Sequence, residues 1–307
     1  MKIAYRRLSG AIALTKNEIG TRGLWLEKRL ALVKFLHERK HTVDYIGRMT
    51  KASKSFEKKI KFDHELLIVE FGSNNTLSYG DDIQETLELC NNTHCHKIFI
   101  CDDPDLPFLW SKVNASEFSA WYNCLNPPKI KDVEVYDFPF SSLQKPISIS
   151  SMYNKSRLVY IGRPFGREKE VEQLIKGKVP WMPYGDKKHW EGINTAVGQA
   201  PSQSVRGNFY NKSIGSIVLY DQKHAKLGWR TGRAFHSVLS GCPAIVFGGN
   251  ENQALKPFLY CETTKAIIDS YERWKNPEAR KRAIEKQIEL ILQEKKIAIK
   301  VLENFGL

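Results

Sequence analysis

The sequence predicts an α/β protein built from two doubly wound parallel sheets that face each other across a cleft. Short apolar runs rich in β-branched residues alternate with amphipathic helical segments in both halves of the chain. An aperiodic stretch rich in Ser, Pro and Lys separates the two halves. In addition, 307 residues are long for a single hydrophobic core.

The first half shows the βαβ rhythm clearly. In chain order we expect strand 3–5, helix 24–39, strands 42–46 and 66–70, helix 81–91 and strand 98–101. Helix 24–39 is predicted by Leu26, Leu30, Val33 and Leu36, which recur at helical spacing. The 81–91 segment opens with two acids, which the positive end of a helix dipole favours.

The second half repeats this rhythm after the aperiodic stretch 139–155, and we place the domain boundary between residues 148 and 149. The expected elements are strand 157–161, helix 168–176, strands 179–184 and 216–220, helix 229–240, strand 243–247 and helix 276–304. Ile284, Ile291 and Val301 contribute to an apolar stripe on the last helix. We expect its end, from about residue 290, to return to the N-terminal domain.

Composition and charge narrow the function classes. The formal net charge of +13 and the pI of about 9.3 favour a polyanionic partner, although the basic residues are spread along the chain. No apolar run reaches the roughly 18–20 residues of a membrane span, and the N-terminus lacks a signal-peptide core. The six scattered cysteines indicate reduced thiols in a cytoplasmic protein, and no second ligand pair stands at zinc-site spacing, so we expect no structural metal. We also expect a monomer that has no membrane partner.

Three carboxylates follow the apolar strand 98–101 directly. Asp102, Asp103 and Asp105 surround Pro104, which ends the strand because it cannot donate to a sheet ladder. Open α/β sheets bind ligands at the carboxyl ends of their strands, so one of these carboxylates is placed to accept a proton from a substrate. The alternative is a solvated turn with no chemical role.

Arginines at strand-to-helix junctions of the second half predict a diphosphate site. Gly162 and Arg163 follow one strand, and Arg167 precedes the next helix. Arg230 and Arg233 are three residues apart, so we expect them to share a helix face. Backbone N–H groups, a helix N-terminus and guanidiniums together bind anions and neutralise a leaving diphosphate without requiring a metal. The alternative is a set of ordinary surface arginines.

Two Rossmann-like halves, a linker and a long final helix form the GT-B plan of nucleotide-sugar transferases. Two-domain dehydrogenases share the layout, but the loop after the first strand, 6–10, lacks Gly-x-Gly-x-x-Gly. Periplasmic-type binding proteins share it too, but they carry a signal peptide. The sequence therefore favours the transferase plan.

Short segments in matching order and spacing carry a resemblance through most of the chain. They are 1–4, 42–46, 67–69 with Ser73 and Asn75, 103–108, 160–168, Arg233 and Ser240. The set resembles the family of T-even phage DNA β-glucosyltransferases, GT-B enzymes that glycosylate hydroxymethylated cytosine. The sharpest match is Asp-Pro-Asp-Leu-Pro-Phe at 103–108, where that family has its catalytic aspartate, while the loop at 162–167 is shorter than the family's phosphate loop.

The resemblance implies an inverting transfer from a UDP-sugar to the hydroxymethyl group of a modified pyrimidine in duplex DNA, which protects phage DNA from nucleases. Asp103 would be the general base, with its pKa raised by Asp102 and Asp105. The implied diphosphate ligands are Arg163, Arg167 and Arg233, and Tyr184 and Gly185 would border the uracil or the sugar. Glu27, Asp102 and Asn75 are candidate sugar or acceptor contacts. The N-terminal domain would bind DNA in the host cytoplasm, and the C-terminal domain would bind the donor.

One departure from the family concerns the donor. Where the family has a ribose-binding glutamate, three residues after the helix arginine, this chain has His236. A neutral imidazole still hydrogen-bonds a hydroxyl, but the sugar is left open between glucose and a pentose such as arabinose, that is, UDP-glucose or UDP-arabinose as donor. Two other functions also stay open: a GT-B transferase for a sugar or lipid acceptor, and a non-catalytic nucleic-acid-binding protein.

Overall fold

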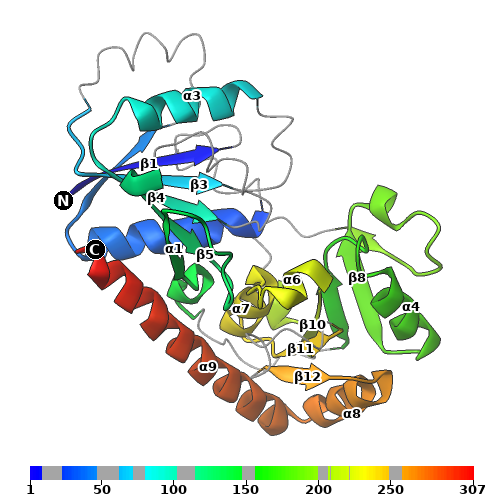
Figure 1. Cartoon of the computed structure of the whole chain (residues 1–307). Coiled ribbons are helices and arrows are strands. Elements are labelled where there is room, and N and C mark those ends of the chain that lie inside the picture. Colours follow the sequence, from blue (N-terminus) through cyan, green and yellow to red (C-terminus); the bar gives the residue numbers. More distant parts are fainter. Residues whose placement is uncertain are drawn as a thin grey trace.

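The computed structural model describes ten stretches of the chain. They are residues 1–8, 23–46, 62–71, 80–101, 115–146, 156–199, 207, 209–220, 222–248 and 258–307. Within them the chain forms two parallel six-stranded sheets, each covered by helices, and a long final helix that runs past both (Figure 1). The GT-B arrangement predicted from the sequence is therefore confirmed as a fold. The boundary predicted at 148/149 lies outside the described residues.

The N-terminal sheet has the strand order β2-β1-β3-β4-β5-β6, and every neighbouring pair is parallel. Its strands are β1 (Lys2–Leu8), β2 (Thr42–Ile46), β3 (Leu66–Phe71), β4 (His96–Cys101), β5 (Phe118–Tyr122) and β6 (Glu134–Asp137). Helices α1 (Gly23–Glu38) and α3 (Gly80–Asn91) accompany it, with the short 3₁₀ helices η3 (Ala115–Glu117) and η4 (Phe140–Leu143).

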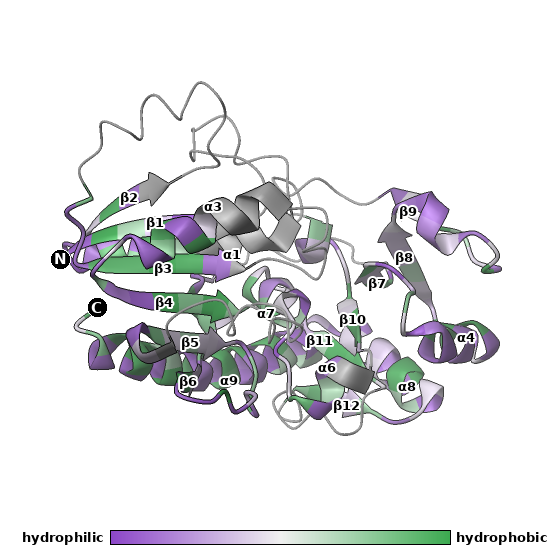
Figure 2. Ribbon diagram, turned by 45° about the horizontal axis from the view of Figure 1, so that its top comes forward, coloured by the Kyte–Doolittle hydropathy of each residue, from purple (hydrophilic) through white to green (hydrophobic). Residues whose placement is uncertain are grey.

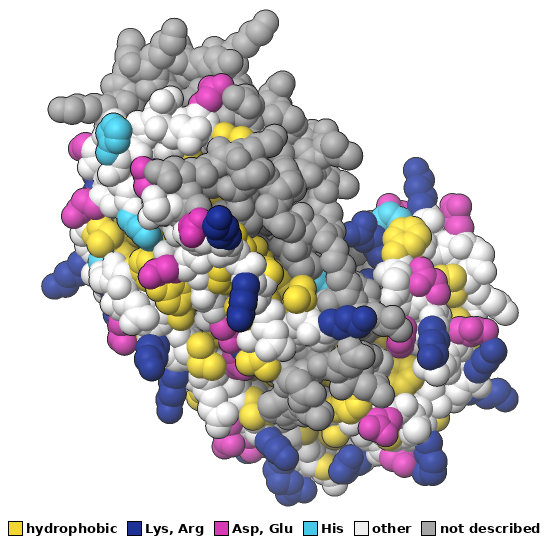
Figure 3. Space-filling view, viewed as in Figure 1, with side chains coloured by type: hydrophobic (Ala, Val, Ile, Leu, Met, Phe, Trp, Pro, Cys, Tyr) yellow, Lys and Arg dark blue, Asp and Glu magenta, His cyan; other side chains and the backbone are white. Residues whose placement is uncertain are grey.

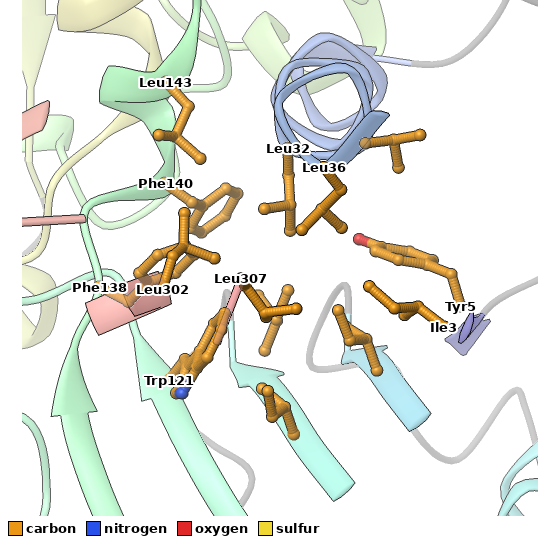
Figure 4. Close-up of a cluster of buried hydrophobic side chains, with 14 of the residues drawn as sticks. Ile3, Tyr5, Leu32, Leu36, Trp121, Phe138, Phe140, Leu143, Leu302 and Leu307 are labelled. Carbon is orange, nitrogen blue, oxygen red and sulfur yellow. The ribbon is translucent and has the colours of Figure 1, made fainter. Parts of the chain in front are cut away.

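Alternate residues of these strands point to opposite faces, and each face has its own core. Ala4, Leu67 and Phe99 pack under α3, whereas their neighbours Ile3 and Ile68 pack under α1 and the end of the final helix. Figure 4 shows this second core, in which side chains from the sheet, α1, η4 and the C-terminus converge. Figure 2 shows the mainly apolar β3 lying among helices that are partly hydrophilic.

The C-terminal sheet has the order β12-β11-β10-β7-β8-β9, again all parallel. Its strands are β7 (Leu158–Ile161), β8 (Trp181–Gly185), β9 (Gly198–Gln199), β10 (Gly215–Leu219), β11 (Ala244–Phe247) and β12 (Leu259–Cys261). Its helices are α4 (Glu168–Lys176), η5 (Lys187–Trp190), α6 (Gln222–Lys226), α7 (Gly232–Leu239) and α8 (Thr264–Lys275). Counted within the domain, this is the Rossmann order 3-2-1-4-5-6, and the order reverses between β7 and β10.

The final helix α9 (Pro277–Asn304) belongs to both domains. It starts with Asn276 as N-cap, whose side chain accepts hydrogen bonds from the N–H groups of Glu278 and Ala279. Ile291 packs in the core under α7, and Leu302 packs in the core of the N-terminal sheet. The predicted return of this helix to the N-terminal domain is therefore confirmed (Figure 1).

The carboxyl edges of the two sheets meet directly. The segment after β5 pairs antiparallel with the segment before α7 through a bridge between Cys124 and Trp229. The Leu125 N–H donates to the Gly228 carbonyl at 3.1 Å, and the Arg230 N–H donates to the Asn123 carbonyl at 2.9 Å. The carboxyl edge of the N-terminal sheet is thus joined to the loops at the carboxyl edge of the C-terminal sheet.

Two expectations from the sequence are wrong in detail. The start of the predicted linker is structured, because η4 and Phe138 are buried in the core against α1 and α9. Helix α7 begins at Gly232 rather than at 229, since Thr231 is its N-cap and Trp229 is paired with Cys124.

Candidate functional site

The reversal point of the C-terminal sheet forms the centre of the candidate site. Gly162 and Arg163 leave the carboxyl end of β7, and the chain turns through Gly166 into α4. Gly166 has φ of 71°, a left-handed conformation that favours glycine. Such a reversal point opens a crevice beyond the strand ends, where doubly wound sheets bind their ligands.

The Arg167 side chain links the turn after β7 to the end of β10, the two strands on either side of the reversal point. It is the residue before α4, and its Nε donates to the carbonyl of Leu219, the last residue of β10, at 3.1 Å. Its Nη1 donates to the Phe165 carbonyl at 2.9 Å, which fixes the turn that carries Arg163. The Arg167 guanidinium therefore lies at the junction predicted for the diphosphate and also organises that junction.

Arg233 reaches the same turn from the first turn of α7. Thr231 caps this helix, and its N–H donates to the Tyr220 hydroxyl at 3.0 Å, which holds the helix start against the end of β10. The Arg233 guanidinium lies 5.8 Å from the ring centre of Tyr160. It also lies close to Gly162, because a Cβ added at Gly162 would be 3.1 Å from the Arg233 Cζ atom.

The third side of the turn is formed by β8 and the chain that follows it. Gly162 donates its N–H to the Tyr184 carbonyl at 2.9 Å, and the Trp190 indole Nε1 donates to the Gly162 carbonyl at 3.2 Å. A Cβ at Gly185 would come within 2.6 Å of the Gly162 carbonyl oxygen, so glycine is needed for this close approach. The half-buried Tyr184 packs edge-on against Phe209.

The structure thus brings together Gly162, Arg163, Arg167 and Arg233, with Tyr184 and Gly185 beside them. The Arg163 side chain is exposed, and Arg233 is only half buried. Guanidiniums on one glycine turn, next to the N-termini of α4 and α7, form an arrangement suited to a diphosphate.

Arg230 is not part of this group, which corrects the prediction that it would share a helix face with Arg233. Its side chain is 0% exposed and forms a bidentate pair with Asp137, at the end of β6. Its Nε lies 2.7 Å from a carboxylate oxygen of Glu294 on α9. A guanidinium enclosed by two carboxylates holds the domains and α9 together and has no access to a ligand.

Burial and neighbouring charge shift the pKa values of this ion cluster in opposite directions. Burial tends to lower the pKa of Arg230, but the two carboxylates outweigh it and the net pKa is raised. Burial raises the pKa values of Asp137 and Glu294, against the opposing effect of Arg230. The cluster is therefore stable only as a complete set.

His236 lies one helical turn after Arg233 and is 3% exposed. Its ring packs edge-on against Tyr210, with 5.4 Å between ring centres. The side chain also lines a pocket between the domains, beside Leu239. The described structure places His236 next to the arginine turn and not on it.

The acceptor side is described only up to the end of its strands. Asp102, Asp103 and Asn75 lie outside the described residues, and for Glu27 only the backbone, in α1, is described. Cys101, which precedes the acidic cluster, is paired in register with Tyr122. Asn123 follows Tyr122 and donates from its side chain to the Arg230 carbonyl at 2.7 Å. The strand that leads to Asp103 therefore ends at the edge that meets the C-terminal domain.

An exposed aromatic residue on the arginine turn was missed by the sequence analysis. Phe165 is 57% exposed and packs edge-on against His189, with ring centres 5.5 Å apart. Lys187 and Lys188 are exposed on the same short helix as His189. The available signal was an aromatic residue in a Gly- and Arg-rich turn, which has no core to join.

The surface charge is dispersed. On the face shown in Figure 3, Lys and Arg side chains are spread over both domains, with acidic residues between them. No group of three His, Cys, Asp or Glu residues is placed to hold a metal ion in the described part of the chain. None of the described helices combines the length and apolar character needed to cross a lipid bilayer.

No protein-family model matches the chain, and no curated protein matches it. Several solved structures are similar in fold. An apo structure of OtsA is 8% identical, with coverage of 99% of this chain and 98% of its own and a TM-score of 0.48. A glycosyltransferase of kitacinnamycin is 9% identical, with coverage of 99% and 98% and a TM-score of 0.45. A UDP-forming α,α-trehalose-phosphate synthase from Burkholderia xenovorans is 9% identical, with coverage of 82% and 76% and a TM-score of 0.47. At these values the likeness carries no inference about reaction or substrate.

Proposed function

We propose that this protein is an inverting glycosyltransferase that moves a sugar from a UDP-sugar to the hydroxymethyl group of a modified pyrimidine in duplex DNA. The observation that carries the proposal is the convergence of Arg163, Arg167 and Arg233 on the Gly162 turn. This turn lies at the reversal point of a Rossmann-ordered sheet, the place where such sheets bind nucleotides.

The donor would lie with its diphosphate on this turn. Its leaving group gains negative charge as the bond between the sugar carbon and the β-phosphate oxygen breaks. Guanidiniums already in place stabilise that charge without reorganisation, which is the main electrostatic contribution available to a transferase. Tyr184, beside the turn, would border the uracil or the sugar.

The acceptor would approach from the N-terminal domain. In the proposed reaction Asp103 removes the proton of the hydroxymethyl group as its oxygen attacks the sugar carbon in line. The sugar is transferred with inversion, UDP leaves, and the proton remains on the Asp103 carboxyl group. The junction of the two carboxyl edges, at Asn123 and Arg230, supports a short path from the strand that precedes Asp103 to the donor turn.

Two observations favour DNA as the acceptor. The formal net charge is +13, which suits a polyanion. Phe165 places an exposed ring on the donor turn, packed against the half-buried His189, and Lys187 and Lys188 are close in sequence to His189. A base in a duplex must leave the stack to reach a buried reaction centre, and aromatic and basic side chains bind unstacked nucleic acid.

Mass spectrometry of DNA tests the whole proposal. Duplexes containing hydroxymethylcytosine, hydroxymethyluracil or unmodified cytosine would be incubated with the protein and UDP-glucose, UDP-arabinose or other UDP-sugars. We expect a mass increase of one sugar residue on a hydroxymethylated duplex, and its absence with Asp103→Asn. Transfer to free sugars or lipids but to no duplex would contradict the DNA acceptor. UDP binding without any transfer would instead indicate a non-catalytic protein.

A further inference from the structure

A pocket of about 270 Å³ lies between the domains. It is lined by residues from both domains and from α9: Ala31, Lys34, Phe35, Glu38, Leu143, Gln144, Lys145, His236, Leu239 and Lys295. Neither Arg163, Arg167 nor Arg233 lines it. The walls come from α1, the end of η4, α7 and α9, so the pocket exists only when these elements are packed together.

The charges that line this pocket are unequal in number. Among the described residues that line it, Lys34, Lys145 and Lys295 carry three positive charges, and Glu38 carries one negative charge. Lys145 donates to the Glu38 carboxylate at 2.7 Å. This hydrogen bond is the main reason why the pKa of Glu38 lies below its usual value, and the charges of Lys34 and Lys295 act in the same direction. Lys145 is paired with Glu38, so the charges of Lys34 and Lys295 remain as an excess of two positive charges among the described lining residues.

Apart from Gln144 and His236, the rest of the described lining is apolar. Ala31 and Phe35 on α1, Leu143 on η4 and Leu239 on α7 form the walls, and the buried His236 adds an aromatic ring. A cleft with low-dielectric walls and charge of one sign concentrates its electric field and attracts ions of the opposite sign. Pockets that are mostly apolar with a few polar groups are typical of small-molecule sites.

We propose that this interdomain pocket binds a small organic phosphate monoester with an apolar body. A phosphate monoester is close to a dianion at neutral pH, which matches the two excess charges of the lysines. Lysine binds phosphate as a point charge and does not require the fork geometry of arginine. The apolar walls would cover the body of the ligand. Since both domains line the pocket, its occupation stabilises their packed arrangement.

Phenyl phosphate is a suitable probe, measured by calorimetric titration of the full-length protein saturated with UDP. Saturation keeps the probe from the arginine turn. We expect phenyl phosphate to bind more tightly than inorganic phosphate, which lacks the apolar body, and than ribose 5-phosphate, whose body is polar. Benzyl alcohol, which lacks the charge, should bind more weakly still.

Binding measurements on substituted proteins test whether phenyl phosphate binds in this pocket. Lys34→Gln and Lys295→Gln should each weaken phenyl phosphate binding about fivefold, the loss expected for one charge pair that solvent still reaches. Glu38→Gln should strengthen it, because the carboxylate found among the described lining residues becomes neutral. Lys296→Gln is the matched control, since this exposed lysine follows Lys295 but does not line the pocket.

Circular dichroism and thermal unfolding show that each variant is folded, and both are expected to match the wild type. The proposal is overturned if phenyl phosphate does not bind, or if it binds Lys34→Gln and Lys295→Gln as tightly as Lys296→Gln. It is also overturned if Glu38→Gln weakens binding. None of these outcomes depends on the identity of the sugar acceptor, so the pocket and the proposed transferase activity are tested separately.

Discussion

Arg167 and Leu219 join the two strands at the reversal point of the C-terminal sheet, because the Arg167 Nε donates to the Leu219 carbonyl at 3.1 Å. The same guanidinium holds the turn that carries Arg163. The Arg167 side chain therefore stabilises the fold and also lies in the proposed donor site. Arg163 and Arg233 make no such bond to a neighbouring strand among the contacts of the described residues.

This difference predicts two classes of arginine variant. Arg163→Gln and Arg233→Gln should weaken UDP binding about tenfold or more, the loss of one charge-assisted contact, and leave stability nearly unchanged. Arg167→Gln should weaken UDP binding and also lower the free energy of unfolding. Calorimetry and urea denaturation measure the two effects. Arg157→Gln is the control, since this exposed arginine precedes β7 at the opposite edge of the sheet. Equal UDP affinity in all four variants would contradict the proposed phosphate site.

The buried ion cluster predicts a large effect on stability. Arg230→Met leaves Asp137 and Glu294 without their cation and should lower the free energy of unfolding by about 3 kcal/mol. Replacing all three residues by apolar ones of similar size should restore much of the loss, because no buried charge then remains unpaired. Denaturant unfolding measures both. A single Arg230→Met variant as stable as the wild type would show that the cluster does not hold the domains.

Acid is expected to destabilise the docked C-terminus through His96. Burial lowers the pKa of His96, whose ring lies 5.5 Å from that of Phe305, so the folded state binds fewer protons than the unfolded state. The free energy of unfolding then falls as the pH drops below the pKa that His96 has in the unfolded state, about 6.5. The loss is complete below the pKa that His96 has in the folded state. Thermal unfolding of wild type and His96→Gln between pH 7 and pH 5 checks this. The variant should lose less stability over that interval, and an equal loss would exclude His96 as the cause.

Phe165 is predicted to act on the DNA acceptor and not on the donor. Phe165→Ser should raise the KM for hydroxymethylated duplex about tenfold, within the range found for one base–aromatic contact, with the KM for the UDP-sugar unchanged. Leu292→Ser is the matched control, because Leu292 on α9 is similarly exposed, at 47% against 57%. If both variants behave like the wild type, the aromatic pair has no role in acceptor binding.

Local patterns were sufficient for most of the fold. The run 98–101 became β4, and 276–304 became α9 within one residue, because apolar periodicity and an Asn-Pro cap are properties of the segment itself. The turn at Gly162 was also predicted from its glycines and arginines. Its neighbours Tyr184 and Gly185 were expected only through the family resemblance, and the hydrogen bond from the Trp190 indole to the Gly162 carbonyl depends on contacts that only the folded sheet provides.

Other features could not be predicted because distant residues determine them. The sequence pattern predicts that Arg230 lies in the first turn of a helix. In the structure its backbone N–H bonds to Asn123 and its side chain pairs with Asp137, and both residues lie more than 90 positions earlier in the chain. Phe140 lies in a Ser- and Pro-rich segment that reads as a linker, and only the docking of α1 and α9 turns it into core. The exposed Phe165 is a different case, because its place in a short Gly- and Arg-rich turn was a local signal of exposure, whereas its contact with His189 depends on the fold.

Helix α9 has a consequence for the order in which the protein matures on the ribosome. The N-terminal sheet completes its hydrophobic core with Ala298 and Leu302, which are synthesised after every strand of the C-terminal sheet. Until the rest of the chain is translated, α1 covers only part of this apolar face in the nascent N-terminal domain. Both domains should reach their native state together at the end of synthesis, and not one after the other.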